Sequence, residues 1–453
     1  MAVGESELQA AIAVTRFGLG ARSGEIQQAA SDPRGWLKAQ IRPGGADGPR
    51  GAAPFPTMAE GLARLGQERM EPRRISNGDS PVHKQLIASL KREGFEEAAA
   101  RFQVATSTPA GFRERWSLFW ANHFTVSDKS VEVAIAAGSF DRDAIRPHVF
   151  ASFQDLLLAS TRHPCMLMYL DQVQSKGPDS MAAWMGKGGL NENLAREIME
   201  LHTVGPDAGY TQADVTEFAR ALTGWSMAGP QEPGVFLYRA AMHEPGARTI
   251  MGRRYNLGGE DQAQTILINL ANDPRTSRRI SHKLAAHFVA DDPPPALVQR
   301  LDTAWRGSGG DLAVVAAALI DAPEGWAPQA RKFKTPYEFL VSAYRAVGAS
   351  PQDAVKDVGA PLMALGQRPY SAPQPNGWSD LAADWAAPDA IVKRLAWAQT
   401  FASGYAPAGD PVATAEDALG ARLTAPTRQA IARAESRPEA LAIMLMSPEF
   451  QRR

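Results

Sequence analysis

Apolar residues recur at spacings of three and four along most of this chain. This spacing places apolar side chains on one face of an α-helix. The segments that show it are 81–106, 111–124, 131–145, 152–162, 190–204, 211–223, 260–289, 296–321, 333–347, 388–402 and 426–448. The best strand patterns, VFLYRA and HEPGARTIMGRRY, fall near residues 235–255. We therefore predict a mainly α fold, with a multi-helix body and a small β-hairpin near residues 235–255.

Stretches rich in glycine and proline divide the chain. The clearest are 42–56, 73–81 and 368–388, where loops are favoured over helices. A chain of 453 residues is long enough for about two or three domains. We expect an N-terminal arm over 1–56, a main helical domain with the candidate site over 57–330, and a C-terminal helical subdomain over 331–453.

The charge balance excludes several classes of partner. The chain carries 48 basic and 49 acidic side chains, so it has no general field that attracts nucleic acid or an anionic membrane. No run approaches the roughly 18 apolar residues of a membrane span. We expect no nucleic-acid partner and no membrane span.

Cysteine content and the N-terminus bear on the compartment. A single cysteine, Cys165, excludes an intramolecular disulfide and a cysteine-rich zinc site, and its apolar neighbours favour an inert, buried thiol. The N-terminus lacks a basic region and is interrupted by Glu5 and Glu7, unlike a signal peptide. We expect a cytoplasmic protein as the sequence stands, or a periplasmic or secreted one if a leader was removed.

The densest group of chemically active side chains lies in residues 190–204. Glu192, Arg196 and Glu200 are four apart and share one stripe of an amphipathic helix. One interpretation is a solvated face with ion pairs. The other is a cleft, in which Arg196 holds one carboxylate ionised while a less solvated carboxyl group acts as an acid.

The same spacing bears on whether this segment holds a metal ion. Glu200 and His202 are two apart, so on a helix they point about 200° away from each other. Glu197 and Glu200 could share a metal ion with a histidine from elsewhere, but the sequence has neither H-E-x-x-H nor E-x-x-H. We assign no metal ligand, and the cofactor is left unknown.

An aromatic helix is predicted over 111–124. Trp116, Trp120 and His123 share one face of it. This pattern fits an aromatic core with a hydrogen-bonded histidine. It also fits a pocket in which tryptophan rings stack on sugar rings and Asn122 donates to a hydroxyl group or an oxyanion.

Other candidates are spread along the chain. His202, Trp225 and His243 are predicted to contact a ligand, His243 because it follows a strand and lies in a turn. Trp225 and Trp378 lie near glycine-rich turns and favour a sugar-like ligand. His287 lies on a basic helix that we expect at the surface.

Six segments resemble a known family when taken together and in order. They are RFGLGAR (16–22), RERWSLFWANHFTVS (113–127), AIRPHVFASFQDLLLASTRHPCMLMYLD (144–171), GLNENLAREIMELHTVGPDAGYTQADVTEFARALTGW (189–225), KFKTPYEFLVSAYRAVG (332–348) and NGWSD (376–380). The family is the bacterial domain-of-unknown-function family 1800, and the resemblance is nearly end to end. It implies a mostly helical protein and assigns no reaction. Because members often lie beside genes for a second family of exported proteins, it also implies an exported partner protein encoded nearby. Many members carry export signals, whereas we expect none in this sequence as it stands.

Two functions fit these observations. The first is a carboxylate- or metal-assisted hydrolase, or a lyase, acting on a polymeric or saccharide-like substrate. Glu192 and Glu200 would be its acid/base pair, oriented by Arg196, with His123, His202 or His243 assisting. The second is a non-catalytic binding or assembly protein that holds a partner in the same groove. Serine hydrolases with a G-x-S-x-G elbow, phosphate-loop proteins and dinucleotide-binding proteins are not supported.

Overall fold

The chain folds into a body of packed helices. The computed structural model describes residues 3–49, 54–70, 81–184, 186, 189–229, 234–356 and 358–453. Across these ranges the chain is mainly helical, and its strands form two antiparallel pairs. The predicted fold class, mainly α with a small β-hairpin, is confirmed.

The strands differ in detail from the single hairpin expected near 235–255. β2 (Phe236–Tyr238) pairs with β1 (Trp225–Met227), and β3 (Arg248–Ile250) pairs with β4 (Arg253–Tyr255). β1 is too short to show an alternating pattern, so the sequence does not identify it as the partner of β2.

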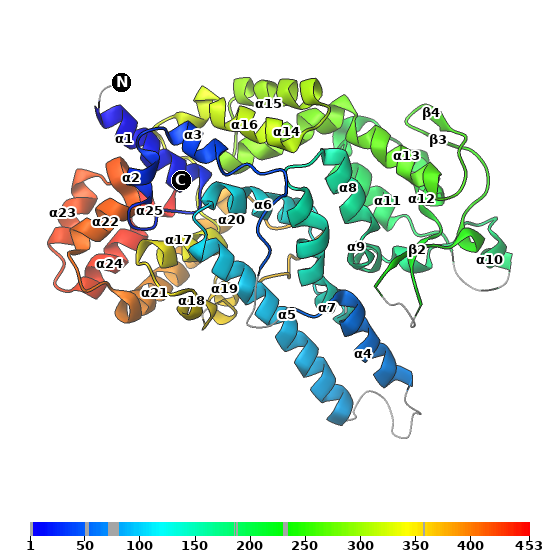
Figure 1. Cartoon of the computed structure of the whole chain (residues 1–453), viewed down its shortest axis with the longest axis horizontal. Coiled ribbons are helices and arrows are strands. Elements are labelled where there is room, and N and C mark those ends of the chain that lie inside the picture. Colours follow the sequence, from blue (N-terminus) through cyan, green and yellow to red (C-terminus); the bar gives the residue numbers. More distant parts are fainter. Residues whose placement is uncertain are drawn as a thin grey trace.

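The N-terminal segment lies beside the C-terminal helices in Figure 1. Its helices are α1 (Val3–Ile12), the π-helical turn η1 (Ala13–Phe17), α2 (Glu25–Ala29) and α3 (Pro33–Lys38). α1 contacts the short turn η9 (Gly420–Arg422), which brings the two ends of the chain together.

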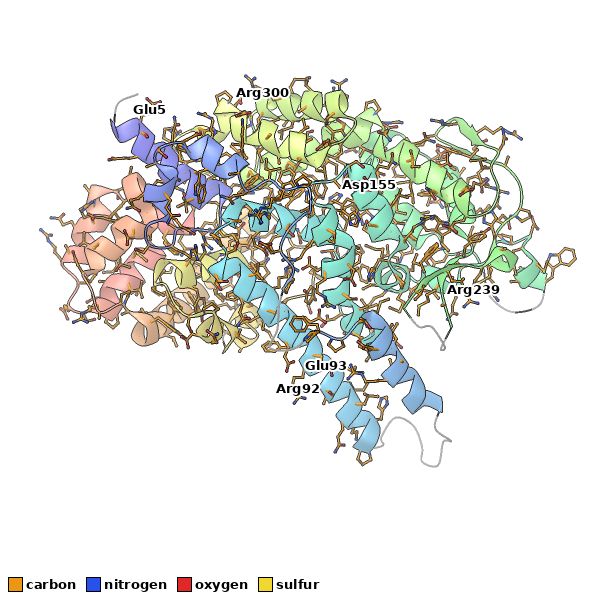
Figure 2. All side chains as sticks on the ribbon, viewed as in Figure 1. Glu5, Arg92, Glu93, Asp155, Arg239 and Arg300 are labelled. Carbon is orange, nitrogen blue, oxygen red and sulfur yellow. The ribbon has the colours of Figure 1, made fainter. Side chains whose placement is uncertain are left out.

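The next two helices form a projection, which is distinct from the N-terminal arm expected over 1–56. α4 (Met58–Met70) and α5 (Pro81–Ser107) project from the body in Figure 1. Figure 2 shows Arg92 and Glu93 on the projecting part of α5. Arg64 of α4 donates to Glu93 at 2.8 Å, so an ion pair joins the two helices of the projection.

The central body holds the helices between the projection and the C-terminal group. They are α6 (Gly111–His123), α7 (Val131–Phe140), α8 (Phe153–Arg162), α9 (Pro164–Tyr169), α10 (Met181–Trp184), α11 (Asn193–Glu197), the π-helical turn η5 (Ile198–His202), α12 (Gln212–Leu222), α13 (Glu260–Ala271), α14 (Pro274–Phe288), α15 (Pro295–Ser308) and α16 (Leu312–Asp321). Two long helices of the prediction are each divided. Asp273 caps α14 by accepting from the Arg275 N–H at 2.8 Å, and Pro274 cannot continue α13. Gly309 and Gly310 adopt positive φ between α15 and α16.

The C-terminal helices complete the body. They are α17 (Pro336–Ala346), α18 (Pro351–Lys356), α19 (Ala360–Ala364), α20 (Ala382–Trp385), α21 (Pro388–Tyr405), α22 (Pro411–Leu419), α23 (Ala425–Ala432), α24 (Arg437–Met446) and α25 (Pro448–Gln451). The helix expected over 426–448 is also divided. Ser436 accepts from the Glu439 N–H at 3.2 Å and begins α24 as a new helix.

Two large apolar cores hold these helices. One includes Phe112 and Trp116 and lies mostly among the central helices. The other includes Phe339 and Tyr344 and lies mostly among the C-terminal helices. Phe102 of α5 belongs to the second core, so the cores do not divide at one point of the chain. The expected domain boundaries after residues 56 and 330 stay a prediction.

Cys165 is wholly buried in the larger core, as its apolar neighbours predict. Burial raises the pKa of its thiol, which disfavours the thiolate needed for nucleophilic attack or metal binding. Within the described ranges, none of the helices combines the length and the apolar character that crossing a bilayer requires.

Arg345 of α17 forms hydrogen bonds that connect three segments of the chain. Its guanidinium donates to the Gly20 carbonyl oxygen at 2.7 Å, the Thr108 carbonyl oxygen at 2.9 Å and Glu25 Oε2 at 2.7 Å. The side chains of Arg345 and Glu25 are 1% and 2% exposed. α17 is thereby fixed to the N-terminal segment and to the turn after α5.

Replacing Arg345 with alanine should therefore lower the free energy of unfolding by about 3–5 kcal/mol, the typical cost of breaking a buried ion pair. Urea denaturation followed by circular dichroism measures this change. Arg428 forms an exposed pair with Glu416, and R428A is the control, with an expected change below about 1 kcal/mol. Equal effects of the two substitutions would contradict the role of Arg345.

Candidate functional site

Glu192 joins two helices at the surface. It accepts hydrogen bonds from Arg196 at 3.2 Å, from Gln212 Nε2 at 2.7 Å and from Thr216 Oγ1 at 2.6 Å, which connects α11 to α12. The Thr216 hydroxyl, together with Gln212 and Arg196, lowers the pKa of this carboxyl group. Glu192 is therefore held as an ionised carboxylate, as the ion-pair interpretation of the stripe expects.

A different carboxyl group of this segment is the better proton donor. Burial raises the pKa of Glu197, and the charge of Glu200 raises it further. Glu200 itself lies within electrostatic reach of Arg279 on α14. Across the described part of the chain, no three or more His, Cys, Asp or Glu side chains are grouped closely enough to hold a metal ion.

The tryptophans predicted to stack on a ligand lie in the apolar core. Trp116, Trp120 and Trp225 are each 0% exposed. Trp116 stacks on Phe150 with ring centroids 6.1 Å apart, and its indole N–H donates to the Val149 carbonyl oxygen at 2.7 Å. No ring face is left for a sugar, so the ligand-stacking prediction is wrong for these three residues and the aromatic-core interpretation holds.

His123 and His202 meet inside the protein beside a lysine. His123 Nε2 donates to the His202 carbonyl oxygen at 3.2 Å, and Lys283 Nζ of α14 donates to His123 Nδ1 at 2.9 Å. Burial, Lys283 and Arg279 lower the pKa of His202 to about 3, and burial lowers the pKa of Lys283 to about 8. Both histidines are therefore neutral at pH 7, and they lie beneath the surface rather than with Glu192.

His243 has both ring nitrogens engaged. Nδ1 donates to the Thr223 carbonyl oxygen at 2.9 Å, and Nε2 accepts from the Gly259 N–H at 3.2 Å. These bonds hold the end of α12 next to the start of α13. His243 thus connects two backbone segments in this conformation, and the structure does not bring it together with Glu192 or His123.

A cavity of about 120 Å³ lies elsewhere, where the central helices meet the C-terminal ones. Residues from α5, α6, α7, α14, α17 and the segment 366–380 line it. The polar side chains among them include Asn122, Asp141, His287, Tyr337, Tyr370 and Asp380. Of the residues that the sequence singled out for ligand contact, Asn122 and Trp378 line this cavity.

His287 and Asp380 form a hydrogen-bonded pair at the cavity. His287 Nδ1 donates to Asp380 Oδ1 at 2.8 Å, and among the described residues His287 Nε2 has no hydrogen-bond partner. Burial lowers the pKa of His287, and Asp380 partly opposes this effect. Burial disfavours ionisation of Asp380, but His287 and Lys332 outweigh it and lower the pKa to about 2. The expectation of a surface position for His287 is wrong, because the segment around Asp380 covers this face of α14.

Tyr337 brings a second unsatisfied group to the cavity wall. Its backbone N–H donates to Gln367 Oε1 at 2.7 Å, which holds the start of α17 against the segment 366–380. Within the described ranges its hydroxyl oxygen is buried without a hydrogen-bond partner. Burial raises the pKa of the Tyr337 phenol, so the hydroxyl stays protonated and can donate a hydrogen bond.

Asn122 holds the turn that carries Asp380. Its Nδ2 donates to the Trp378 carbonyl oxygen at 2.9 Å, and its Oδ1 accepts from the Trp378 N–H at 2.8 Å. Gly377 adopts φ +80°, and a Cβ there would lie 2.5 Å from the Asn122 carbonyl oxygen. Asn122 therefore holds this turn in place, and its predicted direct contact with a ligand stays a prediction.

These contacts bring together three of the segments with family resemblance. Asn122 comes from 113–127, Tyr337 from 332–348 and Asp380 from 376–380. A family model described as "Protein of unknown function (DUF1800)" matches residues 12–452. The chain belongs to this DUF1800 family. No curated protein and no solved structure matches this DUF1800 chain.

Sequence reasoning missed the central pair of this DUF1800 protein. His287 lies outside the resembling segments, and its helix carries several basic residues, which favoured a surface position. The one available signal was the NGWSD turn, whose Asp380 follows a proline-rich loop. Because His287 and Asp380 are 93 positions apart, no local pattern pairs them.

The electrostatics of the pair can be measured by NMR. Since Asp380 partly offsets the effect of burial, D380N should lower the pKa of His287 further below its usual value of about 6.5. Proton–carbon spectra of protein labelled at the histidine rings, recorded against pH, give this value. H287Q assigns the resonance, and H282Q on the exposed face of α14 is the control, because it should leave the titration unchanged. A pKa that rises in D380N would contradict the arrangement.

The turn itself can be tested at Gly377. G377A should lower the free energy of unfolding by about 1–3 kcal/mol, because it adds both a clash and a disfavoured φ. G404A in α21 is the control: a Cβ there meets nothing within 4 Å, so the change should be neutral or stabilising by up to about 1 kcal/mol. Thermal and urea unfolding measure both. An undisturbed G377A protein would contradict the close approach of this turn to the Asn122 backbone.

Proposed function

We propose that this protein is a hydrolase or lyase that works by acid–base chemistry in the cavity between α6, α14 and α17. The observation that carries the proposal is that His287 and Tyr337 line the same cavity and each has a buried polar atom without a hydrogen-bond partner among the described residues. Unsatisfied buried polar atoms cost free energy, and such groups are common where a substrate supplies the missing partner.

The chemistry follows from the two protonation states. His287 is neutral at pH 7, and its Nδ1–H is held by Asp380, so the lone pair on Nε2 is available as a base. In a hydrolysis, His287 takes a proton from water, which attacks the substrate. Tyr337 donates a hydrogen bond to the oxygen that gains negative charge. His287 then returns the proton to the leaving group. In an elimination, the same base removes a proton from the substrate.

The cavity limits what can react there. At about 120 Å³ it holds one small group rather than a chain, since each water occupies roughly 10–15 Å³ on this measure. Trp378 lines the cavity and is partly exposed, so its ring remains available for stacking on a sugar. These features support a substrate whose single unit enters the cavity, in line with the polymeric or saccharide-like substrate expected from the sequence.

The cavity replaces Glu192 and Glu200 as the proposed centre of reaction. Glu192 is saturated with donors and ionised, which suits it neither as an acid nor as a base that must exchange protons. A non-catalytic binding or assembly protein is the alternative, for which the cavity would hold a partner without turnover. An exported partner protein, which the family resemblance implies, also stays a prediction.

Substitutions at the cavity should separate these alternatives. H287Q and Y337F should each lower kcat/KM by about 10²–10⁴-fold on any substrate that wild-type protein turns over, because each removes an acid–base or hydrogen-bonding group. A panel of p-nitrophenyl glycosides and esters detects hydrolysis, and ultraviolet absorbance of an unsaturated product detects elimination.

The matched control is H282Q on the same helix, where the side chain is exposed and should be dispensable. Circular dichroism and thermal unfolding must show that all variants fold. Unchanged turnover in folded H287Q would exclude this base. Absence of turnover on the whole panel, with ligand binding still sensitive to H287Q, would favour the binding alternative.

A further inference from the structure

Two open grooves lie near the cavity: the first shares lining residues with the cavity, and the second shares one with the first groove. The first, called the outer groove, has a volume of about 560 Å³ and is lined by Lys91, Phe95, Asp128, Lys129, Met363 and Tyr370, among others. The second, called the far groove, has a volume of about 630 Å³ and is lined by Ser130, Met168, Asp171, Ser175, Asn191 and Met227, among others. Each is as large as a typical site for a small ligand, roughly 300–1,000 Å³.

The three spaces share walls. Ala98, Arg368, Pro369 and Tyr370 line both the cavity and the outer groove. Ser130 lines both the outer and the far groove. At the residues shared by the cavity and the outer groove, the Asp128 N–H donates to the Tyr370 carbonyl oxygen at 2.9 Å. A chain lying in the grooves would therefore pass Tyr370 to place one unit in the cavity.

The charges of the two grooves cancel. Three cationic side chains, Lys91, Lys129 and Arg368, face three anionic ones, Asp128, Glu132 and Asp171. Lys129 Nζ lies 3.2 Å from Asp171 Oδ2, and Arg368 pairs with Asp128. Pairing within the wall leaves no net field for a polyanion or a polycation, so an uncharged chain fits best.

The remaining groups suit sugar rings. Phe95 is 42% exposed in the outer groove, and its ring offers a face for stacking. In the far groove, Asn191 Nδ2 donates to the Asp171 carbonyl oxygen at 3.0 Å, and the Asn191 N–H donates to Ser175 Oγ at 3.0 Å. These bonds hold the Asn191 amide and the Ser175 hydroxyl in fixed positions, and Lys129 holds the Asp171 carboxylate, so all three groups can form hydrogen bonds with hydroxyl groups of a ligand.

We infer that the cavity and the two grooves form one cleft that binds a neutral polysaccharide chain. The inference rests on the proposed acid–base function, because the cavity is where the bound chain reacts. A neutral polysaccharide has no acidic proton next to a carbonyl group, so among the proposed reactions it selects hydrolysis. Water adds across the glycosidic bond, with one proton passing to the leaving oxygen through His287.

Binding can be measured without turnover by native gel electrophoresis through gels that contain a polysaccharide. Hydroxyethyl cellulose, mixed-linkage β-glucan and galactomannan are the neutral probes, polygalacturonate is the anionic probe and denatured casein is the polypeptide probe. Wild-type protein should be retarded by at least one neutral probe. F95A and D171N should each weaken that retardation about three- to tenfold, because F95A removes a stacking ring and D171N replaces a carboxylate with a weaker, neutral hydrogen-bond acceptor.

Two controls make the test specific. W184A removes a tryptophan that is 86% exposed outside the grooves, and it should bind as the wild type does. H287Q should also keep its binding, because the grooves hold the chain. Binding that is sensitive to F95A but persists in H287Q supports the cleft even if no hydrolysis is detected. The inference is overturned by no retardation in any neutral gel, by equal retardation of F95A and wild type, or by stronger retardation with polygalacturonate or casein.

Discussion

A buried cluster of charges centred on Glu338 lies in the wall of the cavity. This carboxylate, 6% exposed, pairs with Arg115 of α6 and accepts from Arg453 Nε at 3.2 Å and from the Thr335 N–H at 3.0 Å. Burial alone would favour its neutral form, but Arg115 and Arg453 outweigh burial and hold its pKa well below the usual value. Arg453 also donates to the His287 carbonyl oxygen at 2.6 Å. One carboxylate thus links α6, α14 and α17, the three helices whose side chains carry the proposed chemistry.

This cluster explains why a cavity exists between two apolar cores. Apolar side chains at such a boundary would pack to the density of the interior and leave little space. Charged groups instead require fixed partners, so the helices are held at the distance that these pairs set. Buried pairs contribute little net stability compared with apolar packing, although breaking one is costly. Their place along the cavity is therefore better explained by the position of His287 than by stability.

The sequence predicted the parts of the fold that depend on local pattern. Most helix positions followed from apolar spacing. Three predicted helices are divided at Asp273, Gly309 and Ser436, where a cap or positive φ interrupts a continuous pattern, and helices such as α1, α4 and α22 were not predicted. The core position of Cys165 also followed from its neighbours. The site did not follow, because its geometry depends on contacts between distant segments. Asn122 was selected for its amide and its place beside His123, but its partner, Trp378, lies 256 positions away. Glu192 was selected for its charge, and only the donors from α12 show that this charge is already satisfied.

The same reasoning explains why the segment 189–225, the longest with family resemblance, lies outside the cavity. Its contribution is indirect and passes through α14, where Arg279, Lys283 and His287 are four apart and form one polar row. His202 of that segment accepts from His123 through its backbone, and His123 in turn accepts from Lys283. Lys283 lies one helical turn from His287. The negative charge of Asp380 raises the pKa of Lys283 and partly offsets the effect of burial. The segment 189–225 thus contacts the polar row of α14 near Lys283, and the proposed base, His287, lies at the end of that row. A site built in this way constrains residues far from the reacting group, because a shift of α14 at Lys283 would also move His287.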